Sequence, residues 1–137
     1  MEITVTYDRG LVPVTILHLN GKLDGSNYES LIAKAQMYYE SGARDLVLDL
    51  SNLSFLSSAG LSALHRVALL YRGKSVAELE EGWASLHAID RDRGGGVQEH
   101  VKLLNPAPRI REILEMVGFT TFFEIHADLN QVVNSFR

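Results

Sequence analysis

Apolar and polar residues alternate from the first positions of the chain, and this pattern predicts that the fold opens with a β-hairpin. In the stretch ITVTY, Ile3–Tyr7, every second residue is apolar or aromatic, as on one face of a strand. The turn-forming residues Asp8–Gly10 follow, and a second extended run, Val12–Leu19, comes after them. Asn20-Gly21 is a turn signal with no strand pattern behind it, so we expect a loop there that leads to a helix.

Further along, apolar residues recur at the three-and-four spacing that is typical of one helical face. The helices predicted in this way are Ser26–Ser41 before Gly42, one from Ser58–Gly60 to about Gly73, one introduced by Pro106 and Pro108 and closed by Gly118, and one capped by Asp128 with Gln131 three residues on. The last helix is expected to face the core with Leu129, Val132, Val133 and Phe136.

Short, nearly continuous apolar runs predict strands that are covered on both faces. Asp45–Leu50 and Val101–Asn105 are of this kind, and Thr121–Ile125 (TFFEI) is expected to add a short edge strand. Since parallel neighbours need long crossovers, this order of elements predicts an α/β fold, with a mixed β-sheet of four to five strands and about four helices packed on it.

One segment, Lys74–Glu99, is far longer than an ordinary connection of about 2–6 residues, and we interpret it as an inserted helical or loop segment. Ser75 and Glu78 have capping-box spacing, and Trp83 joins an apolar stripe, so a helix docked on the domain's own surface is favoured over one kept for a partner. A chain of 137 residues suits one core, and we expect a single domain over 1–137 with its insertion at 74–99.

Composition narrows the class of protein. The net charge of -4 disfavours an electrostatic grip on nucleic acid or on an anionic bilayer. With no cysteine, thiolate catalysis, thiolate zinc sites and disulfides are excluded. No apolar run approaches the roughly 20 residues that span a membrane, and the N-terminus does not have the pattern of a signal peptide. We therefore expect a cytoplasmic protein that contacts neither nucleic acid nor membrane.

Five serines interrupt the otherwise apolar run Leu50–His65. Serine favours junctions between elements, so we expect Ser51 and Ser54 to shape a turn and Ser57 or Ser58 to cap the following helix. A hydroxyl at the first helical turn faces unpaired backbone N–H groups, where a phosphate could be held. That phosphate would add roughly -1.5 to -2 charges and repel a partner that had packed on a neutral surface. Capping without phosphorylation is the alternative.

Catalytic patterns are weak in this sequence. The stretch FLSSAG lacks the glycine two residues before the serine that a nucleophile elbow requires, and no glycine-rich phosphate loop or metalloprotease spacing occurs. The histidines show no spacing that identifies a base; they are His18, His65, His87, His100 and His126. We expect no enzyme, cofactor or metal, with a small serine hydrolase as a remote alternative.

The stretch LVLDLSNLSFLSSAGLSAL, Leu46–Leu64, resembles the signature of STAS domains, named for sulfate transporters and anti-sigma-factor antagonists. In that family a buried strand ends in Asp-Leu-Ser, and a short loop reaches a serine and a Gly-Leu pair that opens the next helix. LNGKLDGSNY, Leu19–Tyr28, is similar to the family's Gly-x-Leu-Asp segment, and Val101–Ile125 resembles its C-terminal strand, helix and final strand. The resemblance spans about residues 3–136 apart from the insertion, and Asp49–Leu61 is its most specific part.

This resemblance implies a signalling module that binds a serine kinase doubling as an anti-sigma factor and loses that partner when a loop serine is phosphorylated. The motif makes Ser58 the acceptor and Ser57 the second choice, although Ser57 stands where the family tends to have an acidic residue and Ala59 where it often has a hydroxyl. The implied partner-binding residues are Asp24, Asp49, Ser51, Ser57, Ser58, Ala59, Gly60 and Leu61. For Asp24 and Asp49, binding of backbone donors is an equal alternative. A non-phosphorylated scaffold that assembles with itself or with sensor proteins is the other reading.

Overall fold

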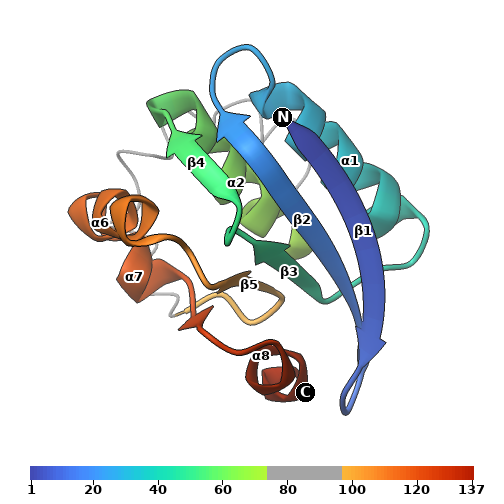
Figure 1. Ribbon diagram of the computed structural model, residues 1–137. Coiled ribbons are helices and arrows are strands. Elements are labelled where there is room, and N and C mark those ends of the chain that lie inside the picture. The colour runs from blue at the N-terminus through green and yellow to red at the C-terminus, as the bar shows by residue number, and fades with distance from the viewer. Residues whose placement is uncertain (74–96) are drawn as a thin grey trace.

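The computed structural model describes residues 1–73 and 97–137, and these form a sheet flanked by helices on both faces (Figure 1). The strands are β1 (Glu2–Arg9), β2 (Pro13–Leu23), β3 (Leu46–Asp49), β4 (Leu53–Leu56), β5 (Val101–Leu104) and β6 (Ile125–His126). The helices of the described residues are α1 (Tyr28–Glu40), α2 (Ser58–Tyr71), α6 (Pro108–Met116), α7 (Phe119–Phe122) and α8 (Leu129–Ser135). The predicted α/β class is confirmed.

The strands are ordered β1-β2-β3-β5-β6, and β4 pairs with the end of β2 outside this path. β1 and β2 form the predicted antiparallel hairpin, whereas every other pairing is parallel. The parallel pairs require the helices as crossovers, which explains why helices follow strands along the chain. β4 is the strand that the hydrophobic pattern did not predict.

Alternation along β2 and β3 divides the apolar residues between two cores. Leu17 and Leu48 belong to the larger core beneath α1 and α2, whereas Ile16 and Val47 pack against Val133 of α8 on the opposite face. Figure 1 shows the short helix α8 crossing only part of that second face. The remainder of the second face carries polar side chains.

The predicted loop at Asn20-Gly21 is wrong, because β2 continues to Leu23. Gly21 adopts a φ of 108°, and the pairing register shifts between Gly21 and Lys22. Glycine tolerates this conformation without steric cost, so the strand bends there and acquires β4 as its new neighbour.

The predicted edge strand Thr121–Ile125 is also largely wrong. Phe119–Phe122 form the helical turn α7, and the strand is reduced to Ile125–His126. Phe119, Phe122 and Phe123 are all buried in the larger core, and their burial outweighs the strand preference of aromatic residues.

The last helix begins as predicted, since the Asp128 carboxylate accepts a hydrogen bond from the Gln131 N–H group at 3.0 Å. Val132, Val133 and Phe136 are buried, but Leu129 is 39% exposed, contrary to the predicted inward face. The greater part of the predicted insertion, including Ser75 and Trp83, lies outside the described residues.

Candidate functional site

The serine-rich stretch Ser51–Leu61, the serine segment, closely follows β3, which ends at Asp49. Asp49 is 9% exposed, and both oxygens of its carboxylate accept hydrogen bonds. One oxygen accepts the N–H and O–H groups of Ser51, at 3.0 and 2.7 Å, and the other accepts the His18 ring at 2.6 Å. Burial alone would raise the pKa of Asp49, but these hydrogen bonds to the charged form outweigh it and hold the pKa below its usual value.

His18 is the neighbour of Asp49 in the parallel pairing of β2 with β3, which places both side chains on the α8 face of the sheet. The His18 Nδ1 atom lies 2.6 Å from Asp49 Oδ2, and its Nε2 atom lies 2.7 Å from Thr6 Oγ1 on β1. The carboxylate accepts the Nδ1–H group, and the Thr6 hydroxyl contacts the other ring nitrogen, Nε2. Sequence reasoning missed this contact, since only the strand register brings the three residues together.

The middle of the serine segment is the short strand β4. The first and last residues of β4, Leu53 and Leu56, are buried, whereas the two between them, Ser54 and Phe55, are exposed. The Ser54 hydroxyl donates to the Gly21 carbonyl at 3.0 Å. These contacts fasten the segment to the bent end of β2, and the exposed Phe55 ring is a surface feature that sequence reasoning did not single out.

Ser57 and Ser58 have different environments although they are adjacent. The Ser57 hydroxyl accepts the Gly60 N–H group at 3.2 Å and therefore caps α2, as the sequence predicted for one of the two serines. Ser58 is the first residue of α2 and is exposed. Ala59, the next residue, is half-buried. Ser58 thus lies at the surface, at the start of the helix.

Gly60 and Leu61 lie beneath this surface. A Cβ atom on Gly60 would stand 2.7 Å from Leu56 Cδ1 and 2.8 Å from the Leu23 carbonyl oxygen, so the glycine lets α2 pack closely on the end of β2. Leu61 is buried in the larger core. Both residues hold the start of α2 in place from within.

Asp24 follows β2 and lies beside the start of α2, because the preceding residue, Leu23, accepts the Ser57 N–H group at 3.0 Å. One carboxylate oxygen of Asp24 accepts the O–H and N–H groups of Ser26, at 2.6 and 2.9 Å. These two hydrogen bonds lower the pKa of Asp24. The structure therefore brings Asp24 near Ser57 and Ser58 and gives it a turn-forming role as well.

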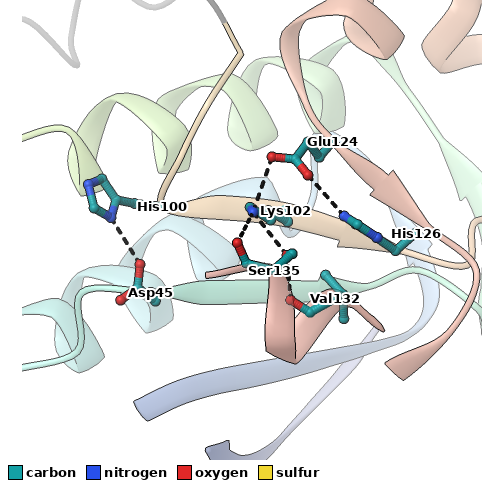
Figure 2. Close-up of polar contacts among 7 residues, drawn as sticks. All are labelled: Asp45, His100, Lys102, Glu124, His126, Val132 and Ser135. Atoms are coloured by element: carbon teal, nitrogen blue, oxygen red, sulfur yellow. Dashed lines mark hydrogen bonds and ion pairs between the residues drawn. The ribbon is translucent and has the colours of Figure 1, made fainter. Parts of the chain in front are cut away.

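A second polar cluster lies on the same face of the sheet, around Lys102 of β5 (Figure 2). Lys102 of β5 is 3% exposed, and its ammonium group donates to the carbonyl and hydroxyl oxygens of Ser135, at 3.1 and 2.9 Å. It also forms an ion pair with Glu124 at 3.1 Å, and Glu124 contacts His126 at 3.1 Å. Asp45 and His100 form a separate pair at 2.9 Å.

This cluster joins three elements that are distant in sequence. Figure 2 shows Lys102 pointing between Glu124, which precedes β6, and Ser135 at the end of α8. The Lys102 ammonium group also lies 4.6 Å from the centre of the Phe136 ring. Sequence reasoning took the run VKLL only as a buried strand; the lysine inside it was the signal that a buried partner exists.

Two properties of the described residues, 1–73 and 97–137, bear on function. They include no helix long and apolar enough to span a bilayer. They also include no cluster of three or more acidic or histidine side chains that could hold a metal ion.

Comparison with known proteins adds a family and relatives. The family model described as STAS domain matches residues 5–77. A protein of Bordetella bronchiseptica named as an anti-sigma factor antagonist, BtrV, is 30% identical over 125 residues, which are 91% of this chain and 85% of that protein. These findings confirm the resemblance drawn from the serine-rich run.

Solved structures share the fold at low sequence identity. An anti-sigma factor antagonist from Mycobacterium paratuberculosis is 17% identical with a TM-score of 0.66, and the match covers 98% of this chain and 93% of that one. The Bacillus cell fate determinant SpoIIAA in its phosphorylated form is 17% identical with a TM-score of 0.53, and the match covers 96% of this chain and 97% of that one.

Proposed function

Because the chain belongs to the STAS domain family, we propose that it acts as an anti-sigma-factor antagonist that binds an anti-sigma factor through the exposed part of the serine segment. The relatives named as antagonists support this role. The observation that carries the proposal is the exposed position of Ser58 at the start of α2.

The binding surface combines Ser58 and Ala59 with Ser57 and the turn at Asp24. Asp49 and Ser51 hold the beginning of the segment, and Gly60 and Leu61 support the start of α2 from beneath. Apart from the Asp24 carboxylate, the side chains of this surface are uncharged, so it suits a protein partner that packs against it. The proposal treats residues 1–137 as one domain with an insertion at 74–99.

Phosphorylation of Ser58 by the partner, acting as a serine kinase, is the proposed switch, and ATP would belong to that partner. The solved Bacillus neighbour exists in a phosphorylated form. A phosphate on Ser58 would adjoin the first backbone N–H groups of α2 and would place a dianion where the partner packs. Ser57 is the less suitable acceptor, because its hydroxyl is committed to Gly60.

The test uses the anti-sigma factor captured by the wild-type chain from its native host and then purified. Ser58→Asp is expected to weaken its binding about 100-fold, because a charge is buried without a partner, whereas Ser58→Ala is expected to retain it. Titration calorimetry measures both affinities. Phosphosite mapping of the wild-type chain isolated from its native host identifies the acceptor. Equal affinities of the two variants would refute control at Ser58.

The alternative is a scaffold that assembles with itself or with sensor proteins without phosphorylation. In that case Ser58→Asp and Ser58→Ala would form the same complexes, and light scattering would give the same mass for both. A mass change in the Asp variant alone supports the switch.

A further inference from the structure

A chain of hydrogen bonds crosses three strands and ends at the serine segment. It runs from the Thr6 hydroxyl to His18, at 2.7 Å, and from His18 to Asp49, at 2.6 Å. From the second oxygen of Asp49 it reaches the N–H and O–H groups of Ser51, at 3.0 and 2.7 Å. Thr6 is exposed on β1, so the chain connects the outer strand of the sheet with the first residue of the segment.

The burial of Asp49 makes its carboxylate depend on this chain of hydrogen bonds. With little access to water, each carboxylate oxygen depends on its protein donors, and the His18 ring is the donor to Oδ2. Without that donor, Oδ2 would be left desolvated and unpaired, so the carboxylate would turn toward water and release Ser51. Thr6 contributes by holding the ring with its Nδ1–H group aimed at Asp49.

We infer that His18 is a positioning residue for the serine segment, acting through Asp49 to fix the backbone at Ser51. The effect on partner binding rests on the proposed function, whereas the effect on the backbone at Ser51 does not. His18 is not in the serine segment, and its role follows only from its register opposite Asp49.

Two variants of His18 separate positioning from mere occupancy of space. Asn places an N–H donor near the position of the His18 Nδ1–H group and keeps the bond to Asp49, whereas Leu fills the space and removes the donor. His126→Leu is the matched control, because the His126 ring also contacts a carboxylate, but that of Glu124 rather than Asp49. Thr6→Val removes only the outer bond of the chain.

The first measurement is hydrogen exchange of the Ser51 amide by NMR, with the Leu103 amide in the sheet core as the reference for global unfolding. His18→Leu is expected to accelerate Ser51 exchange about tenfold or more relative to Leu103. His18→Asn and Thr6→Val are expected to stay within about threefold of wild type, and His126→Leu to leave the ratio unchanged.

The second measurement is affinity for the purified anti-sigma factor described above. His18→Leu is expected to weaken binding about tenfold, with His18→Asn restoring it. Unchanged Ser51 exchange in His18→Leu, or equal acceleration in the Asn and Leu variants, would overturn the inference. Loss of Ser51 protection with unchanged affinity would overturn its functional part. If Ser58→Asp binds like wild type while Ser51 exchange responds as expected, the switch fails and the positioning role stands.

Discussion

The clusters centred on Asp49 and Lys102 occupy the same face of one sheet, and the pairing Val47↔Lys102 and Asp49↔Leu104 places them two residues apart along β3 and β5. Each buries a charged side chain that makes three polar contacts. The Lys102 contacts reach α8 and the residue before β6, and so they hold the C-terminal elements against the sheet. The Asp49 contacts lead instead to an exposed segment.

Under the proposed function, this difference separates residues that stabilise the fold from residues that shape the binding surface. A buried charge is tolerated wherever its hydrogen-bonding capacity is filled, and the same physical rule applies in both clusters. What differs is the object that is held: a helix packed on an apolar patch in one case, and a surface loop in the other. Damage to the Lys102 cluster should therefore affect folding, whereas damage to the Asp49 cluster should affect the shape of the serine segment.

The largest expected effect follows from Lys102→Ala. Removing the ammonium group and its aliphatic stem leaves Ser135 and Glu124 without their donor and opens a gap beside Phe136, so we expect a loss of about 3 kcal/mol in the free energy of unfolding. Urea denaturation measures the loss. Lys102→Met keeps the stem and should lose less. Binding by the folded fraction should be unchanged, and a selective loss of binding would contradict the separation.

A smaller effect is expected from Gly60→Ala, at the buried end of the serine segment. The added methyl group would meet Leu56 and the Leu23 carbonyl at less than 3 Å, so α2 must shift at a cost of about 2 kcal/mol. Urea denaturation measures this cost, and Gly25→Ala is the control, because a Cβ there meets nothing within 4 Å. Equal stability of the two variants would show that α2 adjusts freely.

The smallest effect is expected in acid and compares the two clusters directly. Burial raises the pKa of Asp49 and of Glu124, but hydrogen bonds to Ser51 and His18, and to Lys102 and His126, outweigh it and leave both pKa values lowered. Each carboxylate therefore stabilises the fold above its unfolded pKa, about 4, and this contribution is lost as the pH falls through the lower folded pKa.

Urea denaturation at a series of pH values from 5 downward measures this loss, which is expected at about pH 4 and below. Asp49→Asn and Glu124→Gln should each make the decline of the free energy of unfolding shallower than in the wild type. Asp24→Asn should also make the decline shallower, because the hydrogen bonds from Ser26 lower the pKa of Asp24 in the folded state. A wild-type slope in Asp49→Asn would show that its carboxylate is not stabilised on folding.

The sequence predicted those parts of the fold that depend on local pattern. The hairpin, the helices α1, α2, α6 and α8, and the cap at Asp128 follow from spacing and from capping chemistry, which act over a few residues. The bend at Gly21 and the short strand β4 depend on each other across about 30 residues, and neither has a local signal strong enough to reveal the pair. The aromatic stretch at Phe119–Phe123 was likewise misassigned, because its burial in the tertiary structure decided its conformation.

The candidate site shows the same division. The exposed Ser58 and the capping serine were accessible to sequence reasoning because both lie at a helix start. The partners of Asp49 were not, because a histidine on β2 and a threonine on β1 meet it only through strand register. Phe55 was overlooked because β4, the strand that carries it, was not predicted from the hydrophobic pattern.

The division of tasks between Ser57 and Ser58 has a consequence for reversibility. One hydroxyl keeps the first turn of α2 closed while its neighbour stays available to other molecules. A group attached at position 58 and later removed would therefore leave the helix start intact throughout. The charge at this surface would change and return to its first value without the domain having to unfold and refold.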